Sequence, residues 1–310
     1  MKKFWKISLI ILGSLLAIVC LFLGGSYINN QSKLKKEAKQ IESYGEQLDV
    51  FDGKINVVRS GKDKNKENIL LFPGYGTASP YYDFLPVITK LEKDFNVIVV
   101  EPFGYGLSSQ TKRKRSIENI VEEMHEVITQ LNMDHYILGG HSITGLYGVN
   151  YLNRYKDENV TGFLGIDTSV PTQKMESMNM APFNFLKKSG IMRLYIDSNP
   201  AKGLGMKEDD PNVDQVRMIT LKNSISDNLE EELDLLSENF QKTKKMVLPK
   251  DLPTLMFVAI NDGRDDWVPE HQKQMKQVTN GKMIELKGHH YLHRTQSKAI
   301  AEESNKFFNK

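Results

Sequence analysis

Six short apolar runs in the body of the chain set the strongest limit on its fold. Each run has the length of a buried strand, and several are continuous, as expected where both faces of a parallel sheet are covered. Segments with helical spacing separate them, such as residues 117–131, which Ser116 is placed to cap. This alternation predicts an α/β fold with a mostly parallel sheet. The predicted strands are Asn68–Phe72, Val97–Val100, Tyr136–Leu138, Phe163–Ile166, Leu255–Ile260 and Met283–Leu286, after a hairpin at residues 47–58.

A long uncharged segment lies near the beginning of the chain. After Lys6 no charged residue occurs until Lys33, and Ile7–Leu23 is almost wholly apolar. As a helix, residues 7–28 would be about 33 Å long, enough to cross a hydrocarbon core of about 30 Å. We therefore predict a transmembrane signal-anchor over residues 1–32, with the body of the chain outside the cytoplasm. A cleaved signal peptide is the alternative, although its apolar region is normally shorter and ends at a small-x-small site.

Composition limits the class of partner. The chain has 41 basic and 39 acidic residues, so its charge gives no indication of a nucleic-acid partner. Its only cysteine, Cys20, lies in the apolar segment, so the body has no disulfide.

The regular alternation of strands and helices stops between Val170 and Pro249. We predict that residues 171–249 form a lid subdomain over the carboxyl edge of the sheet. The lid then separates two parts of one core, residues 47–170 and 250–310. Residues 33–46, rich in lysine and glutamate, are predicted to form a juxtamembrane segment.

The stretch GGHSITG, residues 139–145, is a candidate strand-to-helix turn that carries a nucleophile. Ser142 follows a predicted strand and precedes a helix-compatible stretch, which is the context that a nucleophile elbow requires. The pattern G-x-S-x-G is broken, because Thr144 stands where the last glycine is expected and Gly145 comes one residue later. A serine hydroxyl also needs a base, an acid that orients the base, and donors for an oxyanion.

Candidates for these groups follow later strands. The strand TLMFVAI leads into NDGRDDWVP, residues 261–269, and the next strand leads into GHHYLH, residues 288–293. The order serine, aspartate, histidine, each after a strand, is typical of the α/β-hydrolase triad.

With these motifs, the chain resembles an α/β-hydrolase-fold serine hydrolase over residues 48–308. The segment LLFPGYG resembles the oxyanion loop, with Pro73 where histidine is common. VVEPFGYGLSS resembles the D-x-x-G-x-G-x-S stretch, with Glu101 in place of aspartate. NDGRDDWVP resembles the segment that carries the acid, and GHHYLH the segment that carries the histidine.

The resemblance implies a role for each candidate. Ser142 would be the nucleophile, His289 the general base and Asp265 the acid that orients it, while the backbone N–H groups of Tyr75 and Ile143 would form the oxyanion hole. Alternatives stay open at two positions: His290 could replace His289, and Asp266 or Asp262 could replace Asp265.

The predicted activity is cleavage of carboxylic esters through an acyl-enzyme, on a small-molecule or lipid-like acyl substrate and without a cofactor. The resemblance also admits an acyltransferase, a C–C hydrolase, or an aminopeptidase of the proline-iminopeptidase type, for which MKEDDP or NLEEELD could supply carboxylates. A non-catalytic surface binding protein on the same fold is a further alternative. The cluster of His289, His290 and His293 suggests a metal site only weakly, because His289 already has a role and no second ligand-spaced set is present.

Overall fold

The computed structural model describes residues 2–156, 159–175, 179–224, 226–260 and 263–309. The chain divides into two compact units. One unit contains Met1–Glu42 and Met178–Ile225, and the other contains Ser43–Ser177 and Ser226–Lys310.

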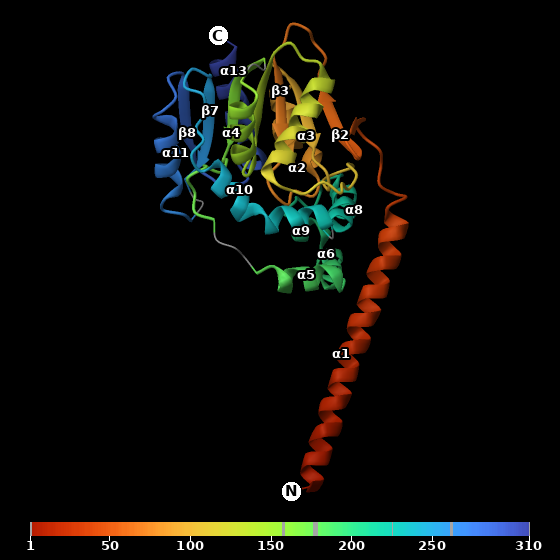
Figure 1. Ribbon diagram of the computed structural model, residues 1–310. Coiled ribbons are helices and arrows are strands. Elements are labelled where there is room, and N and C mark those ends of the chain that lie inside the picture. Colours follow the sequence, from red (N-terminus) through yellow and green to blue (C-terminus); the bar gives the residue numbers. More distant parts are fainter. Residues whose placement is uncertain (1, 157–158, 176–178, 225, 261–262, 310) are drawn as a thin grey trace. The chain divides into compact units, whose positions relative to one another are not determined.

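The second unit is built on an eight-stranded sheet with the strand order β1-β2-β4-β3-β5-β6-β7-β8 (Figure 1). The pairs β1–β2 and β2–β4 are antiparallel, and the pairs from β4–β3 to β7–β8 are parallel. The predicted fold class is therefore confirmed, and every predicted strand is present with small shifts of its ends. The strands are β1 (Glu46–Val50), β2 (Gly53–Ser60), β3 (Asn68–Phe72), β4 (Asn96–Glu101), β5 (Tyr136–His141), β6 (Val160–Ile166), β7 (Thr254–Ala259) and β8 (Gly281–Leu286).

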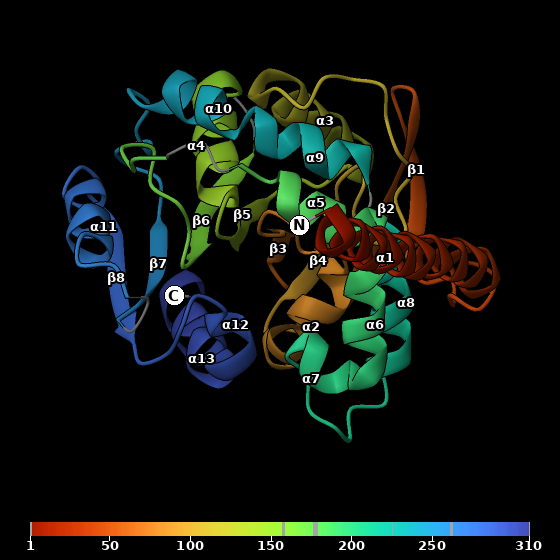
Figure 2. The same cartoon turned by 90° about the horizontal axis from the view of Figure 1, so that it is seen from below.

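Helices cover both faces of this sheet, and Figure 2 shows α3, α4 and α10 on one side of it and α2, α12 and α13 on the other. The side chains of β3 alternate between the two resulting cores: Leu70 and Phe72 pack in one cluster, Ile69 and Leu71 in the other. This alternation explains why the strand is apolar throughout, since both of its faces are buried. The helices of this unit are α2 (Pro80–Leu91), α3 (Ile117–Leu131), α4 (Thr144–Arg154), α9 (Asp227–Asp234), α10 (Leu236–Thr243), α11 (Trp267–Met275), α12 (Leu292–Thr295) and α13 (Ser297–Phe308).

The first unit consists of helices. Its longest helix, α1 (Lys2–Glu37), contains a segment long and apolar enough to cross a membrane, the one such helix among the described residues. The large apolar side chains of that segment are exposed. The other helices of this unit are α5 (Ala181–Lys188), α6 (Ile191–Ser198), α7 (Pro200–Leu204) and α8 (Val213–Asn223).

The predicted lid, residues 171–249, contributes to both units. Helices α5 to α8 belong to the first unit with α1, while α9 and α10 belong to the second unit with the sheet. The segment does lie between β6 and β7, as expected for an insertion into the core. Its function as a lid stays a prediction.

Glu101, which replaces the aspartate of the resembled motif, organises the loop after β4. Its buried carboxylate accepts hydrogen bonds from the Leu107 N–H at 2.7 Å, the Asn56 side chain at 3.0 Å and the Tyr44 hydroxyl at 2.9 Å. Gly106 has a φ of +51°, and a Cβ there would lie 1.9 Å from that carboxylate. The glycine is required because the loop closes directly over the acid.

Candidate active site

Ser142 lies on a strained turn between β5 and α4. Its φ of 53° is in the left-handed region, which residues other than glycine rarely adopt. Two glycines allow the turn to close: a Cβ at Gly140 would lie 2.3 Å from the Phe72 carbonyl oxygen, and one at Gly145 would lie 2.2 Å from that of Ser169. The turn therefore has the geometry of a nucleophile elbow, in which strain is accepted to expose a side chain.

Thr144 accounts for the broken motif. Its side chain is fully buried, and its hydroxyl donates to the carbonyl oxygens of Phe72 at 3.0 Å and Pro73 at 2.8 Å. The threonine thus ties the first turn of α4 to the end of β3, where the loop with Tyr75 begins. The position at which the backbone leaves no room for a side chain is 145, beside Ser169, so the glycine stands there instead of at position 144.

A continuous chain of hydrogen bonds runs from Ser142 through a histidine to an aspartate. The His290 Nε2 atom lies 2.8 Å from the Ser142 Oγ atom, and the His290 Nδ1 atom lies 2.7 Å from the Asp167 Oδ2 atom. Because a carboxylate can only accept, Nδ1 carries the proton and Nε2 is free to accept one from the serine. This arrangement can deprotonate a serine hydroxyl and stabilise the resulting imidazolium.

Burial and hydrogen bonds fix the position of the Asp167 carboxylate. It directly follows β6, is fully buried and has a φ of 48°. Its Oδ1 atom accepts hydrogen bonds from the Ala259 N–H at 2.7 Å and the Trp267 indole N–H at 2.8 Å. With Oδ1 satisfied in this way, Oδ2 remains directed at His290.

The geometry departs from the sequence prediction at both the acid and the base. The histidine bonded to Ser142 is His290, the alternative, and the predicted His289 is exposed. The aspartate bonded to that histidine is Asp167, which the sequence reasoning missed, and the predicted Asp265 is exposed. Asp167 and Asp265 follow the neighbouring strands β6 and β7, so chain order alone does not distinguish them.

The first fallback acid, Asp266, does not join this chain either. Asp266 is 59% exposed and pairs with Arg264 at the surface. Asp262 lies outside the described residues. The signal that could have indicated Asp167 is its position immediately after the apolar run Phe163–Ile166, with no basic residue near it in the sequence.

The predicted oxyanion donors lie in elements next to Ser142. Ile143 follows the serine, and a Cβ at Gly74, which precedes Tyr75, would lie 3.0 Å from the Ser142 Cβ atom. Among the described residues, the backbone N–H groups of Tyr75 and Ile143 donate to no protein acceptor. Both groups are therefore available to an oxyanion, and their role stays a prediction.

A buried polar cluster supports the loop that contains Tyr75. The Tyr105 hydroxyl accepts from the Gly76 N–H at 3.3 Å and donates to Glu232 at 2.9 Å, and Glu232 also accepts from Tyr147 at 2.7 Å. Burial raises the pKa of Glu232, an effect opposed by Arg115 and the two tyrosine hydroxyls. The adjoining cavity of about 20 Å³ has room for roughly one water molecule.

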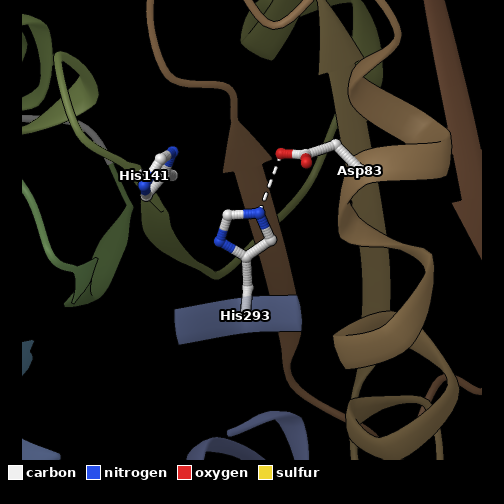
Figure 3. A group of neighbouring side chains, drawn as sticks. All are labelled: Asp83, His141 and His293. Atoms are coloured by element: carbon white, nitrogen blue, oxygen red, sulfur yellow. Dashed lines mark hydrogen bonds and ion pairs between the residues drawn. The ribbon is translucent and has the colours of Figure 1, made fainter. Parts of the chain in front are cut away.

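A second histidine–aspartate pair, His293 and Asp83, is buried next to His141 (Figure 3). The His293 Nε2 atom donates to Asp83 at 2.8 Å, and the ring of His141 lies beside that of His293, with their centroids 4.6 Å apart. The His141 Nε2 atom donates to the backbone carbonyl of His290 at 2.9 Å, which fixes the loop that carries the base. Burial, with His293 and His290 nearby, lowers the pKa of His141, so this imidazole is neutral.

These three side chains also form the one candidate metal cluster in the described part of the chain, with potential ligand atoms within 4.8 Å of one another. The Nδ1 atoms of His141 and His293 are buried without a hydrogen-bond partner among the described residues. However, Asp83 already pairs with Arg294, so its charge is offset and cannot balance a divalent cation. We therefore assign the cluster a positioning role.

The comparisons with known proteins agree with this fold. Residues 67–247 match the α/β-hydrolase fold family. The uncharacterized protein YbdG of Bacillus subtilis (strain 168) is 26% identical over 326 residues, covering 100% of this chain and 99% of YbdG. The chain therefore belongs to the α/β-hydrolase fold family, and it is a hydrolase of that superfamily.

Solved structures show the same fold at low identity. Cfl2 from Burkholderia cenocepacia matches with a TM-score of 0.67 and 17% identity, over 84% of this chain and 94% of Cfl2. The enol-lactonase from Burkholderia xenovorans LB400 matches with a TM-score of 0.62 and 17% identity, over 86% of this chain and 100% of the lactonase. At this identity the likeness concerns the fold alone.

We predict that Asp83→Asn destabilises the protein in a pH-dependent manner. Burial opposes the charge of Asp83, but His293 and Arg294 outweigh it and hold the pKa of this carboxyl well below its usual range. The stabilisation is therefore present above the ordinary pKa of an aspartate, about 3.9, and is lost as the pH falls below it. At pH 7 the substitution should cost on the order of 3 kcal/mol.

Denaturant unfolding of the detergent-solubilised full chain between pH 3 and pH 8 measures this difference. Asp266→Asn, which removes a surface pair, serves as the matched control and should change stability by less than about 0.5 kcal/mol. A cost of Asp83→Asn that does not vary over this pH range would contradict the assignment.

Proposed function

We propose that the protein is a serine hydrolase that cleaves carboxylic esters of a small-molecule or lipid-like acyl substrate. The observation that carries the proposal is the unbroken hydrogen-bond chain from Ser142 through His290 to the buried Asp167. A serine, a histidine and a carboxylate in this order form the unit that activates a hydroxyl for acyl transfer.

In the proposed reaction, the Ser142 Oγ atom attacks the ester carbonyl while His290 takes the hydroxyl proton. Asp167 stabilises the imidazolium, and the N–H groups of Tyr75 and Ile143 bind the oxyanion. His290 then gives its proton to the alcohol that leaves, and an acyl-enzyme remains. A water molecule, deprotonated by His290, releases the acid and restores the serine.

The state of Glu232 removes one candidate partner of an aminoacyl substrate. This glutamate belongs to the NLEEELD stretch, a candidate source of carboxylates for a substrate amine. It is buried and already accepts hydrogen bonds from Tyr105 and Tyr147. A carboxylate engaged in this way is not offered to a substrate ammonium group.

We further propose that α1 anchors the protein in the cell membrane as a single span, with the catalytic unit outside the cytoplasm. Support comes from the length of α1 and from the exposure of its apolar side chains, such as Leu9, Leu16 and Phe22. Exposed apolar side chains over that length are stable in hydrocarbon and costly in water.

The first prediction from this function concerns covalent labelling of the full-length protein with a fluorophosphonate probe. Peptide mapping should find the probe on Ser142, and Ser142→Ala should abolish the label. Asp167→Asn should slow labelling by about 10³–10⁴-fold, because it removes the charge that orients and supports the imidazole.

Asp265→Asn is the matched control, because it makes the same change at the acid that the sequence favoured. Its labelling rate should stay within about threefold of wild type if Asp167 is the acid. Equal loss in both variants would contradict the assignment. Well-folded protein that does not label, even in detergent, would favour the non-catalytic binding protein, and a screen of esters against aminoacyl amides separates an esterase from an aminopeptidase.

The anchor predicts that residues 1–30 remain on the mature protein. Mass spectrometry of protein extracted from membranes should recover peptides from this region, and protease added outside the cell should degrade the catalytic unit. A mature chain that begins after residue 30 would show that the segment is a cleaved signal peptide.

A further inference from the structure

We propose that the hairpin of α5 and α6 docks into the surface of the bilayer that α1 spans. This inference rests on the proposed anchor and adds a second membrane contact to it. The occupant of the surface is the interfacial region of a lipid bilayer with anionic headgroups.

The hairpin carries most of the exposed large apolar side chains that lie outside α1 in the described part of the chain. They are Phe183 (39% exposed), Phe185 (54%), Leu186 (41%), Leu194 (40%) and Tyr195 (64%). A group of this kind on two adjacent short helices differs from the single apolar residues that are scattered over any protein surface.

The turn of the hairpin is fixed to α1 at the point where the apolar segment ends. Gly190, between α5 and α6, has a φ of +83°, and a Cβ there would lie 2.7 Å from the Ser26 carbonyl oxygen and 2.8 Å from the Asn30 Cβ atom. Ser26 and Asn30 are among the first polar residues after the apolar run Ile7–Leu23. If α1 spans the membrane, this contact places the hairpin at the depth of the headgroups.

A buried ion-pair network holds the hairpin in this position. Arg193 on α6 donates to the Asn30 side chain at 2.6 Å and to Glu37 at 2.9 Å. Glu37 also accepts from Arg217 on α8 at 2.8 Å. Burial raises the pKa of Glu37, but the two guanidinium groups outweigh this effect and lower the pKa. The contact between α1 and the helices of this unit is therefore specific, since a buried arginine needs these partners.

The same helix orients the unit relative to the bilayer. Glu37 lies about 16 Å beyond Ser26 along the axis of α1. Beyond Glu37, Gln215 on α8 bonds the Gln40 carbonyl at 3.2 Å and the Glu42 N–H at 3.1 Å. Helix α8 thus contacts the chain from Glu37 onward, whereas the hairpin contacts it from Ser26 to Glu37.

The composition of the hairpin fits the interface of a bilayer. Aromatic side chains and lysines are enriched at this depth of a bilayer. The aromatic rings lie among the headgroups, and the lysine ammonium groups lie at the phosphates. The last turn of α5 contains Lys187 and Lys188, and the Lys187 ammonium lies 4.6 Å from the centre of the Phe183 ring. The last turn of α1 adds Lys35 and Lys36.

The experiment uses single-cysteine variants of the full chain, which the sequence makes simple because Cys20 is the only native cysteine. In a Cys20→Ala background, Leu16→Cys, Phe185→Cys and Asp214→Cys are labelled with an environment-sensitive nitrobenzoxadiazole dye. Each variant is reconstituted into vesicles of phosphatidylcholine and phosphatidylglycerol. Spin-labelled lipids with the label near the headgroup or deep in the acyl chain then quench the dye according to depth.

The dye at Phe185 should be quenched by the shallow label at least about threefold more strongly than the dye at Asp214, which is on the same unit but on α8. Quenching at Leu16 by the deep label reports the anchor separately. If the dye at Leu16 is quenched but the dye at Phe185 is quenched no more strongly than the dye at Asp214, the docking surface is overturned and the anchor stands. No quenching at Leu16 would overturn the anchor, and the docking surface with it.

Two further measurements keep the outcome clear. Tyr195→Cys on α6 repeats the test at a second exposed position, and equal fluorophosphonate labelling of all variants shows that the unit with Ser142 is folded. A blue-shifted dye at Phe185 that lipid spin labels do not quench, and that shifts back on dilution, would mean that a second copy of the chain covers the hairpin and would overturn the proposal.

Discussion

One buried carboxylate joins the elements on which the candidate site depends. Asp167 follows β6, accepts hydrogen bonds from β7 through Ala259 and from α11 through Trp267, and reaches the loop after β8 through His290. A buried charge is tolerated only when its oxygens are satisfied, and here three donors from three elements satisfy them. The hydrogen bonds of Asp167 therefore connect the carboxyl ends of β6 and β7 to the imidazole of His290.

Specific hydrogen bonds offset the backbone strain at the carboxyl edge of the sheet. Ser142 and Asp167 both adopt left-handed backbone conformations, at φ values of 53° and 48°, and they follow the adjacent strands β5 and β6. The Ser142 carbonyl accepts from the Ser169 N–H at 2.7 Å, which holds the two strained turns together. Thr144 binds the same region to the end of β3, so the departure from the usual motif adds a tether.

Local patterns in the sequence predicted the sheet, the helix at residues 117–131 and the strand–turn–helix context of Ser142, because each depends on periodicity within a short segment. The acid and the base depend on packing between distant segments. Asp265 matched the family spacing, but the indole of Trp267 donates to Asp167, and Asp265 is exposed. His289 and His290 are neighbours in an irregular loop, where no periodicity determines which ring faces the serine. The contact of α1 with α6 joins residues more than 150 positions apart, and no pattern within one segment indicates it.

Activation of Ser142 by His290, and not by the adjacent His289, is tested most directly by the rate of fluorophosphonate labelling in the full-length protein. Because the His290 ring is bonded to both Ser142 and Asp167, His290→Ala should reduce the rate by about 10⁴-fold or more, while His289→Ala should leave it within about threefold of wild type. The reverse order, or equal rates in the two variants, would contradict the arrangement.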